Sequence, residues 1–263
     1  MNTQNSFMQI IFRLIKLLIW LGKIGFKLRA LDNAPTAQRQ ATLQQMGSSL
    51  LDVLHIKIEH APTPPHPKGA LVVANHISWL DIFVLNALYP SSFIAAKELR
   101  HWFVIGKMIA NAGTVFIDRS NRKDIDPINL AIAERLQAHE NVCFFPEAKT
   151  SLGNSVLPLK AALFQAAINA QADVQAVALR YYANGQRTER VSFSGTNFFI
   201  TLWRILSLPE IVVRADFSPT ITPYAEHDRF ALKDQAEAFM KHVVESDSPD
   251  PTRVLLNESE RTR

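Results

Sequence analysis

Three apolar runs in the sequence each end at side chains that could carry out acid–base or ionic chemistry. The runs and the residues that follow them are Ala70–Ala74 with Asn75 and His76, Thr114–Ile117 with Asp118 and Arg119, and Val142–Phe145 with Pro146 and Glu147. If these runs are strands of one parallel sheet, their carboxyl ends lie along one edge, where ligands bind in open sheets. The sequence therefore predicts a site in which a base, a cation and an acid converge.

His76 and Asp81 are five residues apart and can form an acid–base pair if the backbone turns between them. In one continuous helix this spacing would place the two side chains about 140° apart. We therefore expect His76 in a turn and Asp81 in the first turn of the next helix, with Ser78 as its N-cap. A buried carboxylate on one imidazole nitrogen leaves the other nitrogen free to accept a proton. The alternative is that Asp81 only caps the helix, because Ser78–Asp81 is similar to a capping box.

The elements that would hold these residues alternate between short apolar strands and helices. The expected strands are Ala70–Ala74, Ser92–Ala95, Thr114–Ile117, Val142–Phe145, Val174–Leu179, Val191–Phe193 and Ile211–Phe217, and the expected helices are Trp79–Leu88, Leu99–Ala112, Pro127–Ala138, Lys160–Ala170 and Asp228–Val244. This alternation is typical of an α/β domain with a largely parallel central sheet flanked by helices.

The first 31 residues contain no acidic side chain, and they carry five basic ones: Arg13, Lys16, Lys23, Lys27 and Arg29. The net charge of the chain is +4, so the remaining residues together carry −1, the difference between +4 and +5. The basic charge therefore belongs to an N-terminal arm, and we expect no nucleic-acid partner for the domain.

The N-terminal arm reads as an amphipathic helix, Phe7–Leu31, followed by a second helix, Thr36–Leu54. Arg13, Lys16, Lys23 and Lys27 share one helical face, and the other faces are apolar. This pattern favours a helix that lies in the headgroup layer of an anionic membrane. An ordinary core helix and a membrane-spanning signal anchor are the alternatives.

The expected organisation has three parts. Residues 1–58 form a membrane-associating helical hairpin, residues 59–245 form the α/β domain, and residues 246–263 form a disordered tail, because this segment is polar and contains two prolines. A stiff proline-rich connector, Pro62–Pro67, lies near the first boundary. The single cysteine, Cys143, is expected to be a buried and inert thiol.

Four segments of the sequence resemble the conserved blocks of the glycerolipid acyltransferase family. Asn75–Asp81 (NHISWLD) resembles the first block, the HX4D motif, and the other three are Gly113–Arg119 (GTVFIDR), Phe145–Ser151 (FPEAKTS, usually FPEGTRS) and Val174–Leu179. They occur in the family's order and spacing, within Ile56–Phe217. The family includes bacterial 1-acyl-glycerol-3-phosphate acyltransferases and lyso-ornithine lipid acyltransferases.

The resemblance implies a direct acyl transfer without a metal or another cofactor. By this resemblance, His76 would deprotonate the free hydroxyl of a lysolipid and Asp81 would orient His76. The hydroxyl would then attack the thioester of acyl-CoA or acyl carrier protein. The acceptor would be bound by a set of residues from the blocks, namely Asn75, Arg119, Glu147, Lys149, Thr150 and Ser151.

The resemblance further implies an acceptor and a location. The simplest acceptor is 1-acyl-glycerol-3-phosphate, and lyso-ornithine lipid is the close alternative. The protein would work on the cytoplasmic face of the inner membrane of a bacterium. An apolar stripe in Phe198–Leu208 would line an acyl-chain groove, enter the bilayer or pack in the core.

Four positions depart from the family pattern. Ala148 replaces the usual glycine of the third block, Lys149 and Thr150 replace its Thr-Arg pair, and Ala176 replaces the proline of the fourth block. If position 148 needs a positive φ, alanine costs about 1 kcal/mol or more there.

A non-catalytic membrane-binding protein on the same fold is the alternative from a different class. A hydrolase with Ser78 or Ser151 as nucleophile is disfavoured, because neither serine lies in a G-x-S-x-G elbow.

Overall fold

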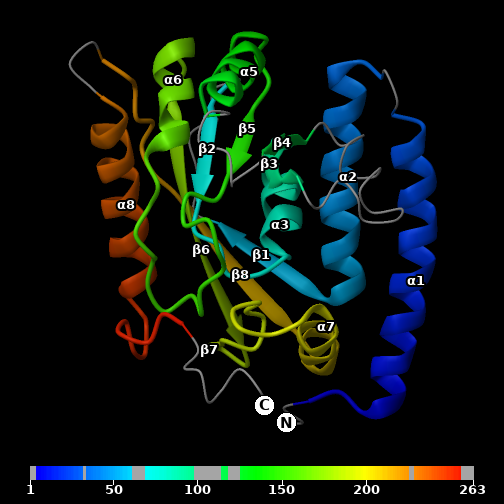
Figure 1. The fold of residues 1–263 in the computed structure, drawn as a ribbon. Coiled ribbons are helices and arrows are strands. Elements are labelled where there is room, and N and C mark those ends of the chain that lie inside the picture. Colours follow the sequence, from blue (N-terminus) through cyan, green and yellow to red (C-terminus); the bar gives the residue numbers. More distant parts are fainter. Residues whose placement is uncertain are drawn as a thin grey trace.

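The computed structural model describes residues 4–31, 34–60, 69–97, 114–117, 125–224 and 228–255. Within these residues, eight strands form one mostly parallel sheet with helices on both sides (Figure 1). The structure thus has the α/β architecture that the alternation of strands and helices predicts.

The strands follow the order β1-β8-β6-β2-β5-β3-β4 across the sheet, and β7 pairs with β6. Their bounds are β1 Ile56–His60, β2 Leu71–Ala74, β3 Ser92–Ala96, β4 Val115–Ile117, β5 Val142–Phe144, β6 Val174–Ala183, β7 Gln186–Arg187 and β8 Ile211–Phe217. Strand β6 runs antiparallel to β7 and β8, whereas the other pairs are parallel. The buried strand β2 lies between β5 and β6, so its carboxyl end emerges between two neighbours.

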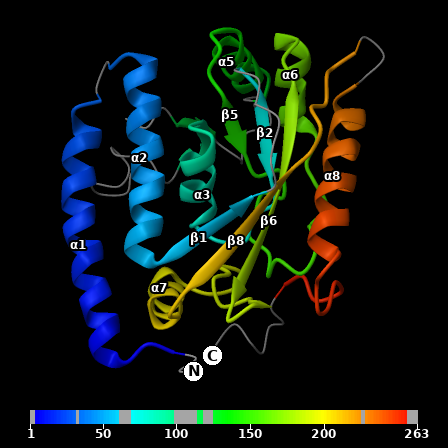
Figure 2. The same ribbon diagram turned by 180° about the vertical axis from the view of Figure 1, so that it is seen from behind.

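Helices cover the sheet with a separate apolar core on each side (Figure 2). One core involves α1 Phe7–Arg29, α2 Thr36–Leu54, α3 Asp81–Leu88 and α7 Phe198–Ser207, and the other involves α5 Ile125–Gln137, the 3₁₀ helix η3 Ala162–Phe164, α6 Gln165–Ala170 and α8 Arg229–Glu245. Strands β2 and β5 are buried on both faces, and so is most of β6, as their short continuous apolar runs suggest.

Strand β1 is the main element that the sequence patterns miss. It pairs in parallel with β8, and its register joins Ile56 to Ile211 and His60 to Ala215. The expected domain boundary after residue 58 therefore falls inside a strand of the sheet. The burial pattern of β1 explains the omission, because only Ile56 of its five residues is fully buried.

Two other expected elements differ in the structure. Val191–Phe193 lies in a turn and loop region instead of a strand. The expected helix Lys160–Ala170 begins only at the 3₁₀ turn that starts at Ala162. The expected helix Leu99–Ala112 lies outside the described residues.

The N-terminal helices form the expected helical hairpin, in which α1 packs along α2 and lies at one edge of the molecule (Figure 1). The indole nitrogen of Trp20 donates to Ser49 Oγ at 2.9 Å and ties the two helices together. In the described part of the chain, no helix is both long enough and apolar enough to cross a membrane.

Arg13 does not belong to the solvent-facing basic stripe that the spacing predicts. It is 5 % exposed and donates to the carbonyl oxygens of Leu208 at 2.6 Å and Pro209 at 2.5 Å. These carbonyls follow the end of α7, where no further helical turn can satisfy them. Arg13 therefore anchors α1 to α7, and the basic stripe is reduced to Lys16, Lys23 and Lys27.

Residues 246–255 pack against the domain, which differs from the expected disorder of this part of the tail. The amide of Leu152 donates to the carbonyl of Val254 at 2.8 Å, and Arg187 forms an ion pair with Asp247 at 2.9 Å. Arg253 pairs with Glu189. Polar residues are ordered here because partners in the loops after β5 and β7 satisfy them.

Candidate active site

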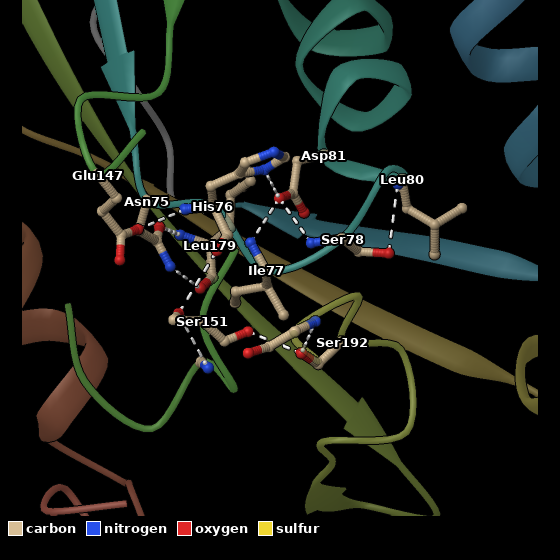
Figure 3. Close-up of polar contacts among 12 residues, drawn as sticks. Asn75, His76, Ile77, Ser78, Leu80, Asp81, Glu147, Ser151, Leu179 and Ser192 are labelled. Carbon is tan, nitrogen blue, oxygen red and sulfur yellow. Dashed lines mark hydrogen bonds and ion pairs between the residues drawn. The ribbon is translucent and has the colours of Figure 1, made fainter. Parts of the chain in front are cut away.

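His76 lies in the loop after β2, and Asp81 is the first residue of α3 (Figure 3). The His76 Nδ1 atom is 2.9 Å from Asp81 Oδ2. The predicted contact is thus confirmed, in the turn-then-helix arrangement that the spacing requires. Since a carboxylate can only accept, Nδ1 carries the proton in the neutral ring and Nε2 is the free basic nitrogen.

Asp81 also organises the loop that carries His76. Its Oδ2 atom accepts the backbone N–H groups of Ile77 at 2.7 Å and Ser78 at 2.9 Å. One carboxylate therefore both holds the loop and orients the imidazole, and it does not cap α3, which has no side-chain cap hydrogen bond. Ser78 is not the N-cap of α3, because the N-cap position is Leu80. The Oγ atom of Ser78 instead accepts the N–H of Leu80 at 3.3 Å, within the turn before the helix.

The imidazole of His76 lies flat against the ring of Phe145. The two ring centroids are 4.0 Å apart and the ring planes differ by 10°. Phe145 follows β5, the strand next to β2 in the sheet. With the carboxylate on one edge and the phenyl ring on one face, the orientation of the imidazole is fixed, and 21 % of its side chain remains exposed.

Glu147 joins the third block to the first. It is 3 % exposed, and its Oε1 accepts the His76 N–H at 2.6 Å while its Oε2 accepts the Leu157 N–H at 2.8 Å. Burial raises the pKa of Glu147 to about 8, against the opposing effect of these two donors. The resemblance implies that Glu147 helps to bind or position the acceptor, and in the structure its carboxyl group holds the backbone of the loop that carries His76.

Asn75 and Ser151, which the resemblance places among the acceptor-binding residues, also lie inside the protein. The Asn75 amide accepts the N–H of Leu179 at 2.7 Å and donates to its carbonyl at 3.0 Å, which continues the pairing of β2 with β6. The backbone N–H of Ser151 donates to the carbonyl of His76 at 2.8 Å. Both residues have no exposed surface, so they hold the loop in place.

The remaining predicted acceptor-binding residues lie in or beyond the third-block loop. Lys149 is exposed and Thr150 is half-buried. Ala148 has φ +62°, so the position does require the left-handed region for which glycine is usual. Arg119 lies outside the described residues.

Two aromatic residues of the site were missed from the sequence. Phe145 stacks on the imidazole, and the hydroxyl of Tyr181 on β6 donates to Asp81 Oδ1 at 2.7 Å. A signal existed for Phe145, because it begins the third block. Tyr181 gives no such signal, since its contact joins residues 100 positions apart.

An aromatic path leads from this site to the outer helices. The Trp79 ring lies 5.5 Å from the Phe198 ring at the start of α7, and the Phe7 ring of α1 lies 6.4 Å from the Trp203 ring of α7. Side chains on this path are exposed, including Phe199 at 79 %. Trp79 belongs to the segment between His76 and Asp81, so this segment adjoins the exposed apolar surface of α7.

Comparisons with known proteins agree with this combination of fold and site. The profile of a family described as Acyltransferase matches residues 55–180. A 1-acyl-sn-glycerol-3-phosphate acyltransferase of Neisseria meningitidis serogroup B is 49 % identical over 249 residues, which cover 94 % of this chain and 98 % of that protein. A lyso-ornithine lipid O-acyltransferase of Brucella abortus is 37 % identical over 190 residues, 67 % of this chain and 71 % of that one.

The crystal structure of the 1-acyl-sn-glycerophosphate acyltransferase of Thermotoga maritima has the same fold. The TM-score is 0.68 with 18 % identity, and the match covers 92 % of this chain and 96 % of that one. The fold and the histidine–aspartate pair define an enzyme of the acyl-transferring class. The chain belongs to the acyltransferase family, as the long match at high identity shows.

Proposed function

We propose that the protein transfers a fatty acyl group from acyl-CoA or acyl carrier protein to the free hydroxyl of 1-acyl-glycerol-3-phosphate, which yields phosphatidic acid. The observation that carries this proposal is the 2.9 Å contact between His76 Nδ1 and Asp81, which leaves Nε2 as the base. The name of the Neisseria meningitidis relative supports the choice of acceptor.

In the proposed reaction, His76 Nε2 takes the proton of the lysolipid hydroxyl while the hydroxyl oxygen attacks the carbonyl carbon of the thioester. The positive imidazolium that forms lies against the Asp81 carboxylate. When the tetrahedral intermediate collapses, the carbon–sulfur bond breaks and the imidazolium returns its proton to the leaving thiolate. A new ester and a free thiol result, and His76 is neutral again.

Two cations are proposed to hold the acceptor phosphate. The first is Lys149, which is exposed and lies two residues after Glu147. The side chain of Glu147 accepts the backbone N–H of His76, so the segment that carries Lys149 is held next to the histidine loop. Arg119 remains a candidate because its planar fork suits phosphate oxygens. Glu147 itself is proposed to position the loop instead of touching the lipid.

Acylation of lyso-ornithine lipid is the competing reaction, supported by the Brucella abortus relative and by the altered third block. The test supplies purified protein with each labelled donor and either lysolipid. We expect phosphatidic acid as the main product. If the main product forms from lyso-ornithine lipid instead, that lipid is the acceptor. Transfer to neither lysolipid would overturn the enzyme assignment.

His76→Ala separates catalysis from membrane binding. Loss of a general base is expected to lower the rate about 10²- to 10⁴-fold, while binding to vesicles stays unchanged. His242→Ala is the matched control, since His242 is exposed on α8. An alanine variant at position 76 with full activity would contradict the mechanism.

The protein is further proposed to bind the cytoplasmic face of a bacterial inner membrane through α1 and α7. Exposed apolar side chains support this, namely Phe7, Met8, Phe12, Ile15, Leu18, Ile19, Leu21 and Phe26 on α1, and Phe198, Phe199, Ile200 and Trp203 on α7. Lys16, Lys23 and Lys27 lie along the border of the α1 surface, where they would meet anionic headgroups.

A further inference from the structure

Tyr181 connects the acid–base pair to the centre of the sheet. Its side chain is 1 % exposed, and its hydroxyl donates to Asp81 Oδ1 at 2.7 Å. The other Asp81 oxygen receives His76 Nδ1 and the two loop amides. The tyrosine is therefore the partner of the carboxylate oxygen that the histidine loop does not use.

We propose that Tyr181 is a positioning residue for acyl transfer, which fixes the rotation of the Asp81 carboxylate and thereby the imidazole of His76. This inference rests on the proposed acyl transfer. Three elements contribute to the resulting chain of contacts: His76 follows β2, Asp81 begins α3, and Tyr181 belongs to β6. Because β6 is anchored in the sheet by β2 and β8, the hydroxyl is held in a fixed place.

Burial of both partners makes this hydrogen bond hard to replace. Asp81 has no exposed surface, so water cannot replace the tyrosine if its hydroxyl is removed. A buried carboxylate oxygen without a donor loses the stabilisation of a charged hydrogen bond, and the group is then free to rotate. Burial and the neighbouring Asp81 raise the pKa of the Tyr181 hydroxyl well above its usual range, so the hydroxyl keeps its proton.

Few other titratable groups surround the pair in the described part of the chain. Besides Tyr181, Asp81 raises the pKa of the Cys143 thiol on β5 and of Glu147 after β5, in each case after the larger effect of burial. Neither forms a hydrogen bond with Tyr181, whose hydroxyl donates to Asp81. A change at position 181 therefore acts first on the histidine–aspartate pair.

Tyr181→Phe is the test, because it removes the hydroxyl and keeps the ring. We expect kcat to fall about 10- to 100-fold, the range of one hydrogen bond to a charged group, with little change in KM. The acidic limb of the kcat/KM profile should move to higher pH, because a carboxylate with one donor fewer holds the imidazolium proton more strongly. Tyr182→Phe is the control, since Tyr182 bonds to Asp247 instead.

A double-mutant cycle with Asp81→Asn distinguishes positioning from general support of the fold. If Tyr181 acts through Asp81, Tyr181→Phe costs almost nothing further in the Asp81→Asn protein. An equal loss in both backgrounds with an unmoved pH profile would overturn the proposal, as would unchanged kcat in the single variant.

An NMR measurement separates this inference from the proposed function. The Nδ1 proton of His76 is assigned by its absence in His76→Ala. It should shift or exchange faster in Tyr181→Phe and stay unchanged in Tyr182→Phe. If the wild-type protein transfers no acyl group but this proton responds, the function fails and the positioning role stands. No response in the resonance would overturn the positioning role.

Discussion

At the scale of single residues, the site is built from buried polar groups around one partly exposed imidazole, that of His76. Asp81, Asn75 and Ser151 have no exposed surface, and each uses its polar atoms to hold the loop around His76. The polar atoms of Asn75 and Ser151 are therefore engaged in hydrogen bonds within the protein. The cost of burying them is met by paired donors and acceptors.

Glu147 leads to a prediction about stability and pH. Its pKa in the folded protein is about 8, raised from 4.5 mainly by burial. Between these two values the folded state holds a proton that the unfolded chain has lost, so the stabilising contribution is complete below pH 4.5 and disappears as the pH rises through 8. The free energy of unfolding of the wild type should therefore fall across this interval.

Glu147→Gln supplies the comparison, because glutamine does not titrate. Denaturant titrations at several pH values should show a shallower pH dependence for the variant than for the wild type. Parallel curves for the two proteins would contradict the assigned pKa. The difference between the two stability curves reports on Glu147, because the other titratable groups are the same in both proteins.

At the scale of elements, the position of Asp81 depends on the contact between α2 and α3. A Cβ atom at Gly47 would lie 2.5 Å from the Phe83 carbonyl oxygen and 2.7 Å from the Ala87 nitrogen. These are backbone atoms of α3, so the helix would have to move as a unit. The helix that begins with Asp81 can approach α2 this closely only because position 47 has no side chain.

Gly47→Ala is expected to destabilise the protein by about 1–3 kcal/mol, as overpacking of a core does, and to lower acyl transfer by displacing Asp81. Gly22→Ala on α1 is the matched control, because nothing lies within 4 Å of its Cβ position. It should stabilise the protein by about 1 kcal/mol through helix propensity. The same sign for both variants in thermal unfolding would contradict the close-contact argument.

At the scale of the whole molecule, most of the proposed membrane surface lies on α1, the outer helix of the N-terminal hairpin. Three exposed side chains near its middle are Phe12 at 58 %, Ile15 at 49 % and Ile19 at 54 %. Replacing all three with serine removes apolar area that would enter the bilayer. Partitioning into anionic vesicles should weaken about 100-fold, at roughly 1 kcal/mol for each partly inserted side chain.

Leu130→Ser is the control for this experiment, because Leu130 is 58 % exposed on α5, which packs in the opposite core. Co-sedimentation with the same vesicles should be unaffected. Circular dichroism of each variant checks that the helices remain. If the triple variant and the control bind equally well, the membrane surface lies elsewhere.

The sequence by itself determined the alternation of strands and helices, the hairpin helices and the contact between His76 and Asp81. These features depend on local periodicity, and on a spacing of five residues that one turn can close. The glycine that is usual at position 148 of the third block also indicated where a positive φ could be required, and Ala148 has one.

Only the tertiary structure decided the contacts between distant segments. It paired β1 with β8, buried Arg13 against the end of α7, turned Glu147 under the loop of His76, and brought Tyr181 to Asp81. Each of these joins residues far apart in the chain. No periodicity records them, because they depend on how the sheet orders its strands and on which buried polar groups need partners.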